Sequence, residues 1–389
     1  MSHILPFRGI IPQANLASSI VNGLEFSSFT DICLNFDQNL KNGRLILTQS
    51  PSFFIYEVQD LDHSYTGIWT STDSKDLQNG IIRKHEKIYP SRSQNILDMF
   101  TKNQIDFNPI LITYPNRKSI DSFILKTKSR KAFIEVWEDF NQKLTRLWII
   151  EESEEIDFLI REFKDLDSVY LADGHHRAYA FQQWVSQEPK RDPSQTLPGF
   201  SSIYFSLDQV SIRAYHRLIT LYHPKDYPQI FEKIKTLFEV IPVREIGLPH
   251  SKGEFFLMDF LNGLYILRLK SSSSNDLIQR KDLNDFTHIP ASLMVENLDV
   301  SVLQKYLFQE CMGIGTKNEL GKLEYAGGKD AEKLITGQVL SEKAHMGIFL
   351  FPPNFDEIKT ISNAGLFMPQ KSTYFEPKIP SGLIIQDLS

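Results

Sequence analysis

The stretch Val-Tyr-Leu-Ala-Asp-Gly-His-His-Arg at residues 169–177 decides how we interpret this chain. An apolar run that suits a strand leads into a glycine turn, and residues 177–185 are then expected to form a helix. A helix that begins here would present unpaired backbone N–H groups and the positive end of its dipole. The stretch therefore predicts a strand–turn–helix unit that suits an anion at the turn.

The side chains of this turn are candidates for chemistry. Arg177 carries a guanidinium that matches phosphate or carboxylate, and the amides after Gly174 would hold the same anion. Asp173 would orient a histidine or act as a general base, while His175 and His176 can transfer protons near neutral pH. The alternative is that Asp173 only caps the helix, with the histidines exposed beside it. We favour the functional interpretation, because clusters of titratable groups are typical of functional sites.

A second segment, residues 81–87, reads Ile-Ile-Arg-Lys-His-Glu-Lys. His85 and Glu86 would supply acid–base groups, and Arg83, Lys84 or Lys87 would bind an anion. The alternative for this segment is a solvated, charged face.

A third segment, residues 368–378, reads Met-Pro-Gln-Lys-Ser-Thr-Tyr-Phe-Glu-Pro-Lys. Its ammonium and hydroxyl groups are hydrogen-bond donors that suit phosphate, and they belong to Lys371, Ser372, Thr373 and Lys378. An ordinary loop near the C-terminus is the alternative. We expect the three segments to converge around one anion.

Signals for metals and cofactors are weaker. The histidines lack a Cys-x-x-Cys or His-x-x-x-His partner, so we expect no structural zinc, whereas a magnesium ion carried in with a phosphate stays open. ATP or ADP is the nucleotide that would suit such a site. Residues 313–316 resemble half of a dinucleotide fingerprint but follow a helix-like stretch, and neither a Gly-x-x-x-x-Gly-Lys phosphate loop nor a Gly-x-Ser-x-Gly motif occurs.

The composition limits the class of protein. Hydrophobic residues make up 41% and charged residues 23%, and the net charge of -6 argues against non-specific nucleic-acid binding. Cys33 and Cys311 are too few for a disulfide framework, so a reducing compartment is expected, with Cys311 as a small buried side chain. Because no signal peptide and no membrane-spanning apolar run is visible, we expect a cytoplasmic protein without a membrane partner.

Periodicity and turn residues predict an irregular mixture of strands and helices. Strands are expected at residues 45–48, 53–58, 65–69, 110–114, 146–150, 168–172, 202–207, 254–258 and 264–269, with a hairpin turn at Asn262–Gly263. Helices are expected at residues 156–163, 177–185, 230–238, 301–311 and 331–339. This order favours an α+β fold over a doubly wound parallel sheet.

The length suggests two domains. Residues 191–199 carry two prolines among polar residues and are the candidate boundary, and residues 271–274 are expected to form a loop tip. We expect an α+β domain at residues 1–200 with the first two segments, and an α+β domain at residues 201–389 with the third.

These segments, in this order, resemble the bacterial and archaeal family called domain of unknown function 1015. The resemblance is carried by Pro6-Phe7-Arg8 and by residues 83–86, 172–177, 368–375, 377–378 and 381–383. The family commonly has Arg-Tyr after the two histidines, whereas Ala178 precedes Tyr179 here, so no role is carried over to that tyrosine. The resemblance implies no particular activity.

Over a short stretch, residues 173–177 also resemble the phosphate-binding turn of the ParB and sulfiredoxin superfamily. That superfamily includes nucleotide hydrolases, a free-serine kinase and sulfiredoxin. The resemblance implies mixed sheets around a ParB/sulfiredoxin-like strand–turn–helix core, with additional α/β elements and nucleotide phosphate held beside His and Arg.

Together these patterns favour an enzyme similar to a kinase, phosphatase or nucleotide hydrolase. It would perform phosphoryl transfer or phosphate-ester hydrolysis on a nucleotide or a small phosphorylated metabolite, with serine or phosphoserine as one candidate. The alternative is a nucleotide-binding switch with little catalysis. DNA binding of the ParB type is disfavoured by the net charge and by the lack of a visible helix-turn-helix. A homodimer is compatible with the sequence.

Overall fold

The computed structural model describes residues 2–22, 36–88, 90–138, 142–187, 199–271 and 289–388. Cys33 and most of the expected loops at 191–199 and 271–274 lie outside these ranges. Two compact units are present: unit 1 comprises Met1–Lys84, Ile88–Ser211 and Pro377–Ser389, and unit 2 comprises His85–Lys87 and Ile212–Glu376. The expected division into domains at residues 1–200 and 201–389 stays a prediction.

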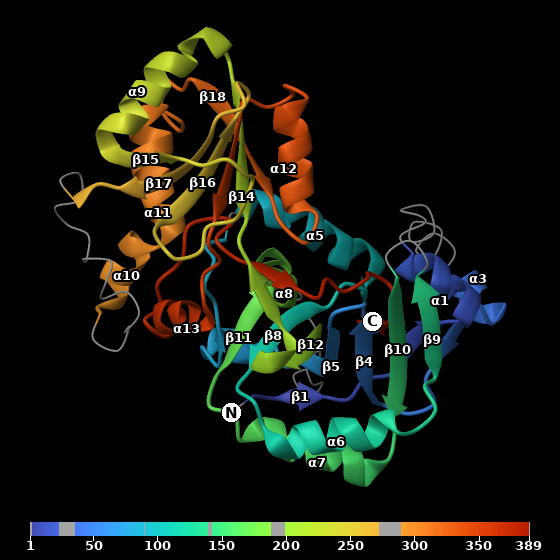
Figure 1. The fold of residues 1–389 in the computed structure, drawn as a ribbon. Helices are drawn as coiled ribbons and strands as arrows, with labels where there is room; N and C mark the ends of the chain where they lie inside the picture. The colour runs from blue at the N-terminus through green and yellow to red at the C-terminus, as the bar shows by residue number, and fades with distance from the viewer. Residues whose placement is uncertain are drawn as a thin grey trace. The chain divides into compact units, whose positions relative to one another are not determined.

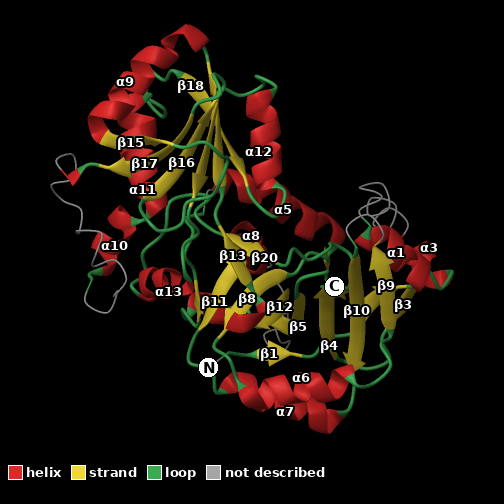
Figure 2. Ribbon diagram, in the orientation of Figure 1, coloured by secondary structure: helices red, strands yellow, loops and turns green. Residues whose placement is uncertain are grey.

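Unit 1 contains a nine-stranded mixed sheet in the order β6-β11-β8-β12-β5-β4-β10-β9, with β1 paired to β5 (Figures 1 and 2). Its strands are β1 (Ile4–Leu5), β4 (Phe53–Gln59), β5 (Ser64–Thr72), β6 (Ile82–Arg83), β8 (Ile110–Tyr114), β9 (Ile134–Glu138), β10 (Lys143–Ile150), β11 (Val169–Asp173) and β12 (Phe200–Ser206). β11 runs parallel to β6 and antiparallel to β8, and its register with β8 shifts between Leu171 and Asp173. Regular pairing therefore ends where the first candidate segment begins its turn.

The described helices of unit 1 pack in two apolar cores, those after residue 74 on this sheet and those before residue 42 in a separate core. They are α1 (Ala14–Val21), α3 (Phe36–Lys41), α4 (Lys75–Gln78), α5 (Pro90–Asn103), α6 (Lys118–Lys128), α7 (Ser153–Lys164) and α8 (His175–Gln187), with a 3-10 turn at Leu207–Gln209. Phe181 of α8 is fully buried, with ring centroids 5.6 Å from Phe100 of α5 and 5.7 Å from Phe200 of β12. These aromatic contacts fix the direction of α8 and thus the position of the turn that precedes it.

A second, four-stranded sheet of unit 1 has the order β3-β2-β21-β7. Its strands are β2 (Gly9–Pro12), β3 (Leu45–Leu47), β7 (Ile105–Asp106) and β21 (Ile385–Asp387). Because β21 pairs with β7, Gln386 lies opposite Asp106, and the last residues of the chain become part of unit 1. This pairing explains how Lys378 comes to lie in the same unit as the first candidate segment.

Unit 2 is built on a six-stranded sheet in the order β15-β17-β16-β19-β14-β18. Its strands are β14 (His216–Leu221), β15 (Phe238–Pro242), β16 (Glu254–Asp259), β17 (Leu264–Leu269), β18 (Gly321–Ala326) and β19 (Met346–Leu350), and two short strands are β13 (Ser211–Arg213) and β20 (Tyr374–Glu376). The expected hairpin at Asn262–Gly263 is confirmed, since β16 and β17 pair antiparallel across it. Asn262 has a φ of 65°, a value that asparagine tolerates in tight turns.

Alternating side chains of this sheet enter two cores. Phe255 and Leu257 belong to the core beneath α9, whereas Phe256 and Met258 belong to the core beneath α12. Figure 1 shows α9 and α12 on opposite faces of the sheet. The helices are α9 (Tyr227–Leu237), α10 (Ala291–Asn297), α11 (Asp299–Val302), a π-helix (Leu303–Cys311), α12 (Ala331–Leu340) and α13 (Phe355–Asn363), with a 3-10 turn at Pro224–Asp226.

The α+β class expected from the sequence is confirmed by these mixed sheets and helices. Cys311 is buried with its thiol free, as expected, and burial raises its pKa to about 12. Gly313 and Gly315 follow the π-helix rather than a strand, so the dinucleotide fingerprint fails in the structure as it does in the sequence. Within the described residues, no helix is long and apolar enough to cross a membrane.

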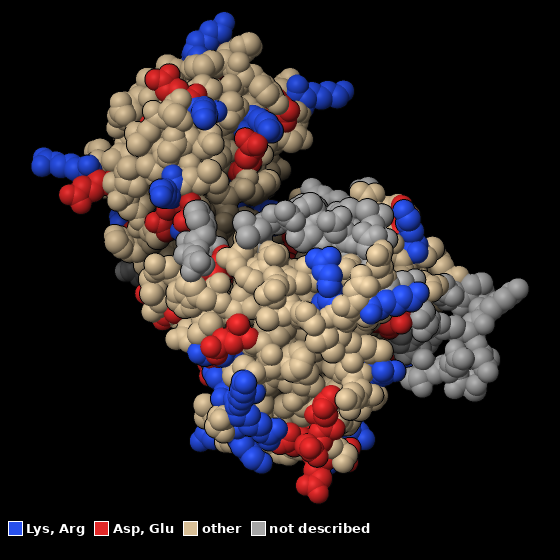
Figure 3. Space-filling model, turned by 90° about the vertical axis from the view of Figure 1, so that its right-hand side faces the viewer, with Lys and Arg blue, Asp and Glu red and all other residues tan. Residues whose placement is uncertain are grey.

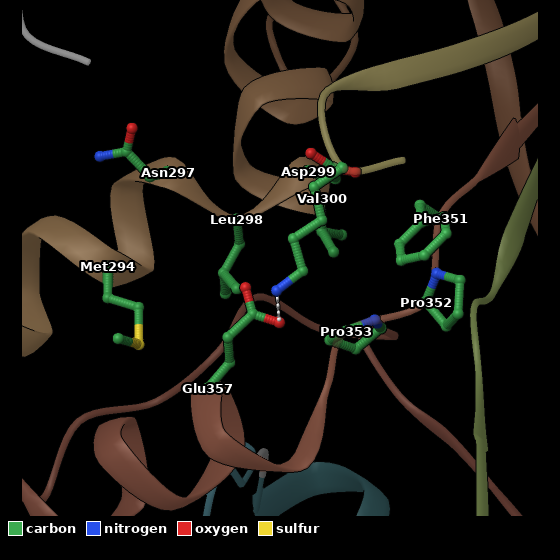
Figure 4. A pocket seen from close by; sticks show the side chains of 10 residues that line it. Met294, Asn297, Leu298, Asp299, Val300, Phe351, Pro352, Pro353 and Glu357 are labelled. Atoms are coloured by element: carbon green, nitrogen blue, oxygen red, sulfur yellow. Dashed lines mark ion pairs between the residues drawn. The ribbon is translucent and has the colours of Figure 1, made fainter. Parts of the chain in front are cut away.

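A small pocket of unit 2 lies between α10, α11 and the start of α13 (Figure 4). Lys252 Nζ is 2.7 Å from Glu357 Oε2, and the same carboxylate accepts a hydrogen bond from the N–H of Asn354, which caps α13. The cavity measures about 20 Å³, which is room for roughly one water molecule. We therefore assign the Lys252–Glu357 pair to the stability of this helix end.

Candidate functional site

The turn between β11 and α8 depends on Gly174. Its φ of 98° is a backbone conformation that residues with a Cβ rarely adopt. A Cβ at this position would also lie 2.9 Å from Nη2 of Arg177, because the guanidinium folds back over the turn. Glycine is thus required here both for the backbone angle and for the close approach of Arg177.

Arg177 is held against the segment that precedes β8. Its Nη1 donates to the backbone oxygen of Asn108 at 3.2 Å and also to the side-chain oxygen of Asn108, while Nη2 lies 3.7 Å from Asp173 Oδ2. Burial lowers the pKa of Arg177, and the negative charges of Asp173 and Asp106 oppose this effect. The side chain is 17% exposed, so one edge of the turn still reaches solvent.

Asp173 receives a second cation from a distant part of the chain. Lys378 Nζ donates to Asp173 Oδ2 at 3.2 Å, and the N–H of Gly174 donates to Oδ1 at 3.0 Å. Burial by itself would raise the pKa of Asp173, but the charges of Lys378 and Arg177 and these hydrogen bonds outweigh it, and the pKa lies below its usual value. Asp173 is therefore an ionised hydrogen-bond acceptor and a weak proton acceptor at neutral pH.

Asp106 lies close enough to Arg177 for their charges to interact, and it was not among the residues expected from the sequence. It is 3% exposed, and its carboxylate accepts hydrogen bonds from the N–H groups of Ser201 at 2.8 Å and Asn108 at 3.4 Å. Burial raises its pKa to about 6, although both hydrogen bonds and the charge of Arg177 act in the other direction. Neither Asp106 nor Asn108 belongs to a recognisable motif, so no sequence signal pointed to them.

The two histidines of the turn lie in different surroundings. His175 is 4% exposed, and His176 is partly exposed with Nδ1 3.3 Å from the hydroxyl oxygen of Ser93 on α5. Their opposed environments follow from their adjacent places in the first turn of a helix, where neighbouring side chains point in different directions. Catalytic roles for both histidines stay predictions.

Arg83 and Lys84 lie next to this turn in the sheet order. Arg83 ends β6 and is registered with Tyr170 of β11, and its Nε is buried with no hydrogen-bond partner among the described residues. Lys84 Nζ lies 3.4 Å from Gln182 Oε1 on α8, and burial lowers its pKa. These two cations of the second segment therefore belong to unit 1, beside the first segment.

His85 and Glu86, the other half of the second segment, belong to unit 2. His85 is 2% exposed, its Nε2 lies 3.0 Å from Thr373 Oγ1, and its backbone oxygen accepts a hydrogen bond from the N–H of Met368 at 2.8 Å. Glu86 forms a parallel bridge with Met368. The second and third segments thus meet within unit 2.

The rest of the third segment forms a tight turn in unit 2. Lys371 has a φ of 58°, and the hydroxyl of Ser372 donates to the backbone oxygen of Pro369 at 2.5 Å. Lys378 is the exception, because it follows the crossing at Pro377 into unit 1. A single pocket shared by all three segments stays a prediction.

One group of residues in the described part of the chain has metal-ligand spacing, namely Asp60, Asp62 and His63. They form an exposed turn after β4, where Asp60 Oδ1 accepts hydrogen bonds from the N–H groups of the other two. That role in the turn accounts for the cluster.

Figure 3 shows a face on which Lys and Arg occur in small groups that alternate with Asp and Glu.

A sequence model of proteins of unknown function, DUF1015, matches residues 5–301, more than half of the chain. The chain belongs to this family. The DUF1015 match covers the first and second segments, whereas the third segment lies beyond its end. The resemblance of the turn to the ParB and sulfiredoxin superfamily stays a prediction. Among curated proteins, none matches this chain.

Several solved structures share limited similarity with this DUF1015 protein. A free serine kinase in complex with AMP is 13% identical, covers 78% of this chain and 89% of its own, and has a TM-score of 0.36. A conserved hypothetical protein from Pyrococcus furiosus is 14% identical, with coverages of 79% and 92% and a TM-score of 0.35. SbnI with a C-terminal truncation, from Staphylococcus aureus, is 10% identical, with coverages of 81% and 87% and a TM-score of 0.38. Scores of this size do not establish a common overall fold.

Proposed function

We propose that unit 1 binds the phosphate of a nucleotide or small phosphorylated metabolite at the β11–α8 turn, and that it catalyses phosphoryl transfer or phosphate-ester hydrolysis there. One observation carries the proposal. Arg177 and Lys378, which lie far apart in the sequence, both reach Asp173 at the N-terminal end of α8. Arg83 and Lys84 lie beside the same turn, so in the described part of the chain four cations outnumber the carboxylates of Asp173 and Asp106. The resulting local positive charge suits an anion.

The backbone adds to this charge. The first turn of α8 has N–H groups without partners inside the helix, and the helix dipole places a partial positive charge at the same end. Arg83, in the neighbouring strand, contributes a buried Nε without an acceptor among the described residues. A buried donor of this kind is stabilised when a ligand supplies the missing acceptor.

The proposed chemistry needs positioning and charge more than a strong base. In phosphoryl transfer, a hydroxyl oxygen forms a bond with phosphorus while the bond from phosphorus to the leaving oxygen breaks, and the hydroxyl loses its proton. Arg177 and Lys378 would stabilise the charge on the phosphoryl oxygens. Asp173 would accept the hydrogen bond of the attacking hydroxyl and, as the new oxygen–phosphorus bond forms, its proton, which then passes to solvent. His176 would be a nearby titratable group. A magnesium ion bound with the phosphate would find a carboxylate ligand in Asp173.

Serine and phosphoserine are the substrates to examine first. The reason is the resemblance of residues 173–177 to a superfamily that includes a free-serine kinase. A small hydroxyl compound is also consistent with a site whose described groups are charged donors and the carboxylates of Asp173 and Asp106.

The test compares Gly174→Ala with Gly43→Ala. Both glycines have positive φ values, 98° and 68°, but only at Gly174 would the new Cβ meet another group, the guanidinium of Arg177. We expect Gly174→Ala to lower turnover by roughly 100-fold or more, because a misplaced reacting group costs about that factor. Phosphorus NMR of the full chain with magnesium, serine and ATP or ADP, and in reverse with phosphoserine, measures the turnover.

Gly43→Ala controls for the backbone strain of an alanine at positive φ, since nothing lies within 4 Å of its Cβ. Equal turnover in the wild type and both variants would contradict the proposal, as would equal losses in the two variants. Tight nucleotide binding without any turnover in the wild type would favour the regulatory alternative.

A further inference from the structure

Unit 2 contains a buried arginine that has no carboxylate partner among the described residues. Arg217, on β14, is 2% exposed. Its Nη1 donates to the backbone oxygen of Tyr215 at 2.7 Å, and its Nη2 donates to the backbone oxygen of Lys371 at 3.2 Å. The guanidinium centre lies 4.7 Å from the ring centroid of Tyr325. A guanidinium has five N–H donors, and the two hydrogen bonds that Arg217 forms with described residues use two of them.

Lys371 places a second positive charge nearby. Its Nζ lies 4.8 Å from the ring centroid of Tyr215 and 3.4 Å from the hydroxyl oxygen of the same tyrosine. In the described part of the chain, none of the ion pairs includes Lys371 or Arg217. Bringing two cations together without a carboxylate is unfavourable, and an external anion would stabilise the arrangement.

The positive charge of Arg217 affects the neighbouring histidine, His216. His216, between Tyr215 and Arg217, is 7% exposed, and its Nδ1 accepts a hydrogen bond from the N–H of Leu350. Burial, together with the charges of Arg217 and Arg213, lowers the pKa of His216 to about 4. The histidine is therefore neutral at physiological pH and adds no further charge.

A glycine turn lies against the same tyrosines. Gly327 and Gly328 connect β18 to α12, and Gly328 has a φ of 92°, close to the 98° of Gly174. A Cβ at Gly327 would lie 2.5 Å from the ring of Tyr374 and 2.9 Å from the ring of Tyr215. Both rings thus pack directly on the backbone that leads into the first turn of α12, where unpaired N–H groups and the positive end of the dipole are found.

We propose that Lys371, Arg217, Tyr215 and Tyr374, with the turn at Gly327–Gly328, form a second anion site in unit 2. The ligand is a small oxyanion, which is the phosphate or carboxylate group of a metabolite. Lys371 and the tyrosine hydroxyls supply polar contacts, and the buried charge of Arg217 supplies a field that little solvent screens. The site is built from residues of unit 2, whereas the β11–α8 turn belongs to unit 1, and it does not depend on the proposed catalytic activity.

The simpler interpretation is that Arg217 only ties the turn at Lys371 to β14. Both interpretations predict that removal of the Arg217 guanidinium destabilises unit 2. They differ for Lys371, because its ammonium group makes no contact that the tie requires. Replacement of that ammonium group should therefore change binding without changing stability, and this separates the two interpretations.

The experiment is calorimetry on the full chain with three probes: inorganic phosphate, phosphoserine and acetate. We expect Lys371→Met to remove one class of binding sites, with at least a tenfold loss of affinity, and to leave the class that Arg177→Gln removes. Lys322→Met is the matched control, because Lys322 is an exposed lysine on β18 that pairs with Glu324. Binding of phosphate and phosphoserine but not acetate would identify a phosphate site, and binding of all three a general oxyanion site.

The proposal is overturned if Lys371→Met lowers the affinity for every probe by no more than Lys322→Met does. If Lys371→Met does not fold, Arg217→Lys replaces it, since this variant keeps the charge but loses the paired N–H geometry. We then expect weakened binding, and unchanged binding overturns the proposal. Loss of binding in Arg177→Gln alone would leave the proposed function in place while it removes the second site.

Discussion

Arg177→Gln is expected to weaken the binding of phosphoserine or ADP by roughly 10- to 100-fold, because hydrogen bonds to charged groups contribute about 1.5–3 kcal/mol. The glutamine can still reach towards Asn108, but it has neither the charge nor the paired donors of the guanidinium. Arg177→Lys should recover part of the loss, since it restores the charge without the fork. Calorimetry at fixed salt concentration measures all three proteins.

Arg117→Gln is the matched control for this experiment. Arg117 is also in unit 1 and also binds a backbone oxygen, that of Glu162, together with the Glu162 carboxylate. It lies outside the candidate site, so its replacement should leave the affinity unchanged. Equal affinity of the wild type and Arg177→Gln, or equal losses for Arg177→Gln and Arg117→Gln, would show that Arg177 does not bind the anion.

Asp106→Asn is expected to stabilise unit 1 relative to the wild type, and to do so more at pH 7 than at pH 4. The carboxyl of Asp106 has a pKa raised by burial from 3.8 to about 6, so the folded state holds a proton that the unfolded state releases between these values. The contribution of Asp106 to wild-type stability therefore falls as the pH rises from about 4 to about 6. The shift in pKa corresponds to about 3 kcal/mol in the free energy of unfolding. The gain in the variant is smaller than this, because an amide group must fit where the carboxylate of Asp106 accepts hydrogen bonds from two N–H groups.

The measurement is urea unfolding followed by tryptophan fluorescence at pH 4 to 7. All four tryptophans of the chain lie in unit 1, so the signal reports on that unit. Asp98→Asn, at an exposed carboxyl on α5, is the control and should keep the wild-type pH dependence. A stability difference between Asp106→Asn and the wild type that stays constant from pH 4 to 7 would contradict the assignment.

The strands were the best predicted elements of the fold. The expected strand at residues 110–114 coincides with β8, and the hairpin at Asn262–Gly263 was placed correctly. Both depend on local information: a short β-branched apolar run and a turn sequence with a strong conformational preference. α5 and α6 were missed, because their apolar residues are diluted by lysines, serines and asparagines and they are helical through packing on the sheet.

The turn at residues 173–177 was predicted from sequence because a strand, a glycine and a helix are local features. Its partners were not, because they come from remote parts of the chain. Lys378 reaches Asp173 only because the C-terminal strand β21 pairs with β7. Asp106 and Arg217 are unremarkable in sequence, and only burial gives them unusual electrostatics. Long-range pairing and burial are tertiary properties that a single sequence does not display.

The most direct test of the central claim is a crystal structure of the full chain with phosphoserine or ADP and magnesium. Our account predicts a phosphate group at the β11–α8 turn, with its oxygens about 2.7–3.2 Å from donors of Arg177 and the first amides of α8. A phosphate bound elsewhere in unit 1, with the Arg177 guanidinium still hydrogen-bonded to Asn108 and no anion at the turn, would contradict it.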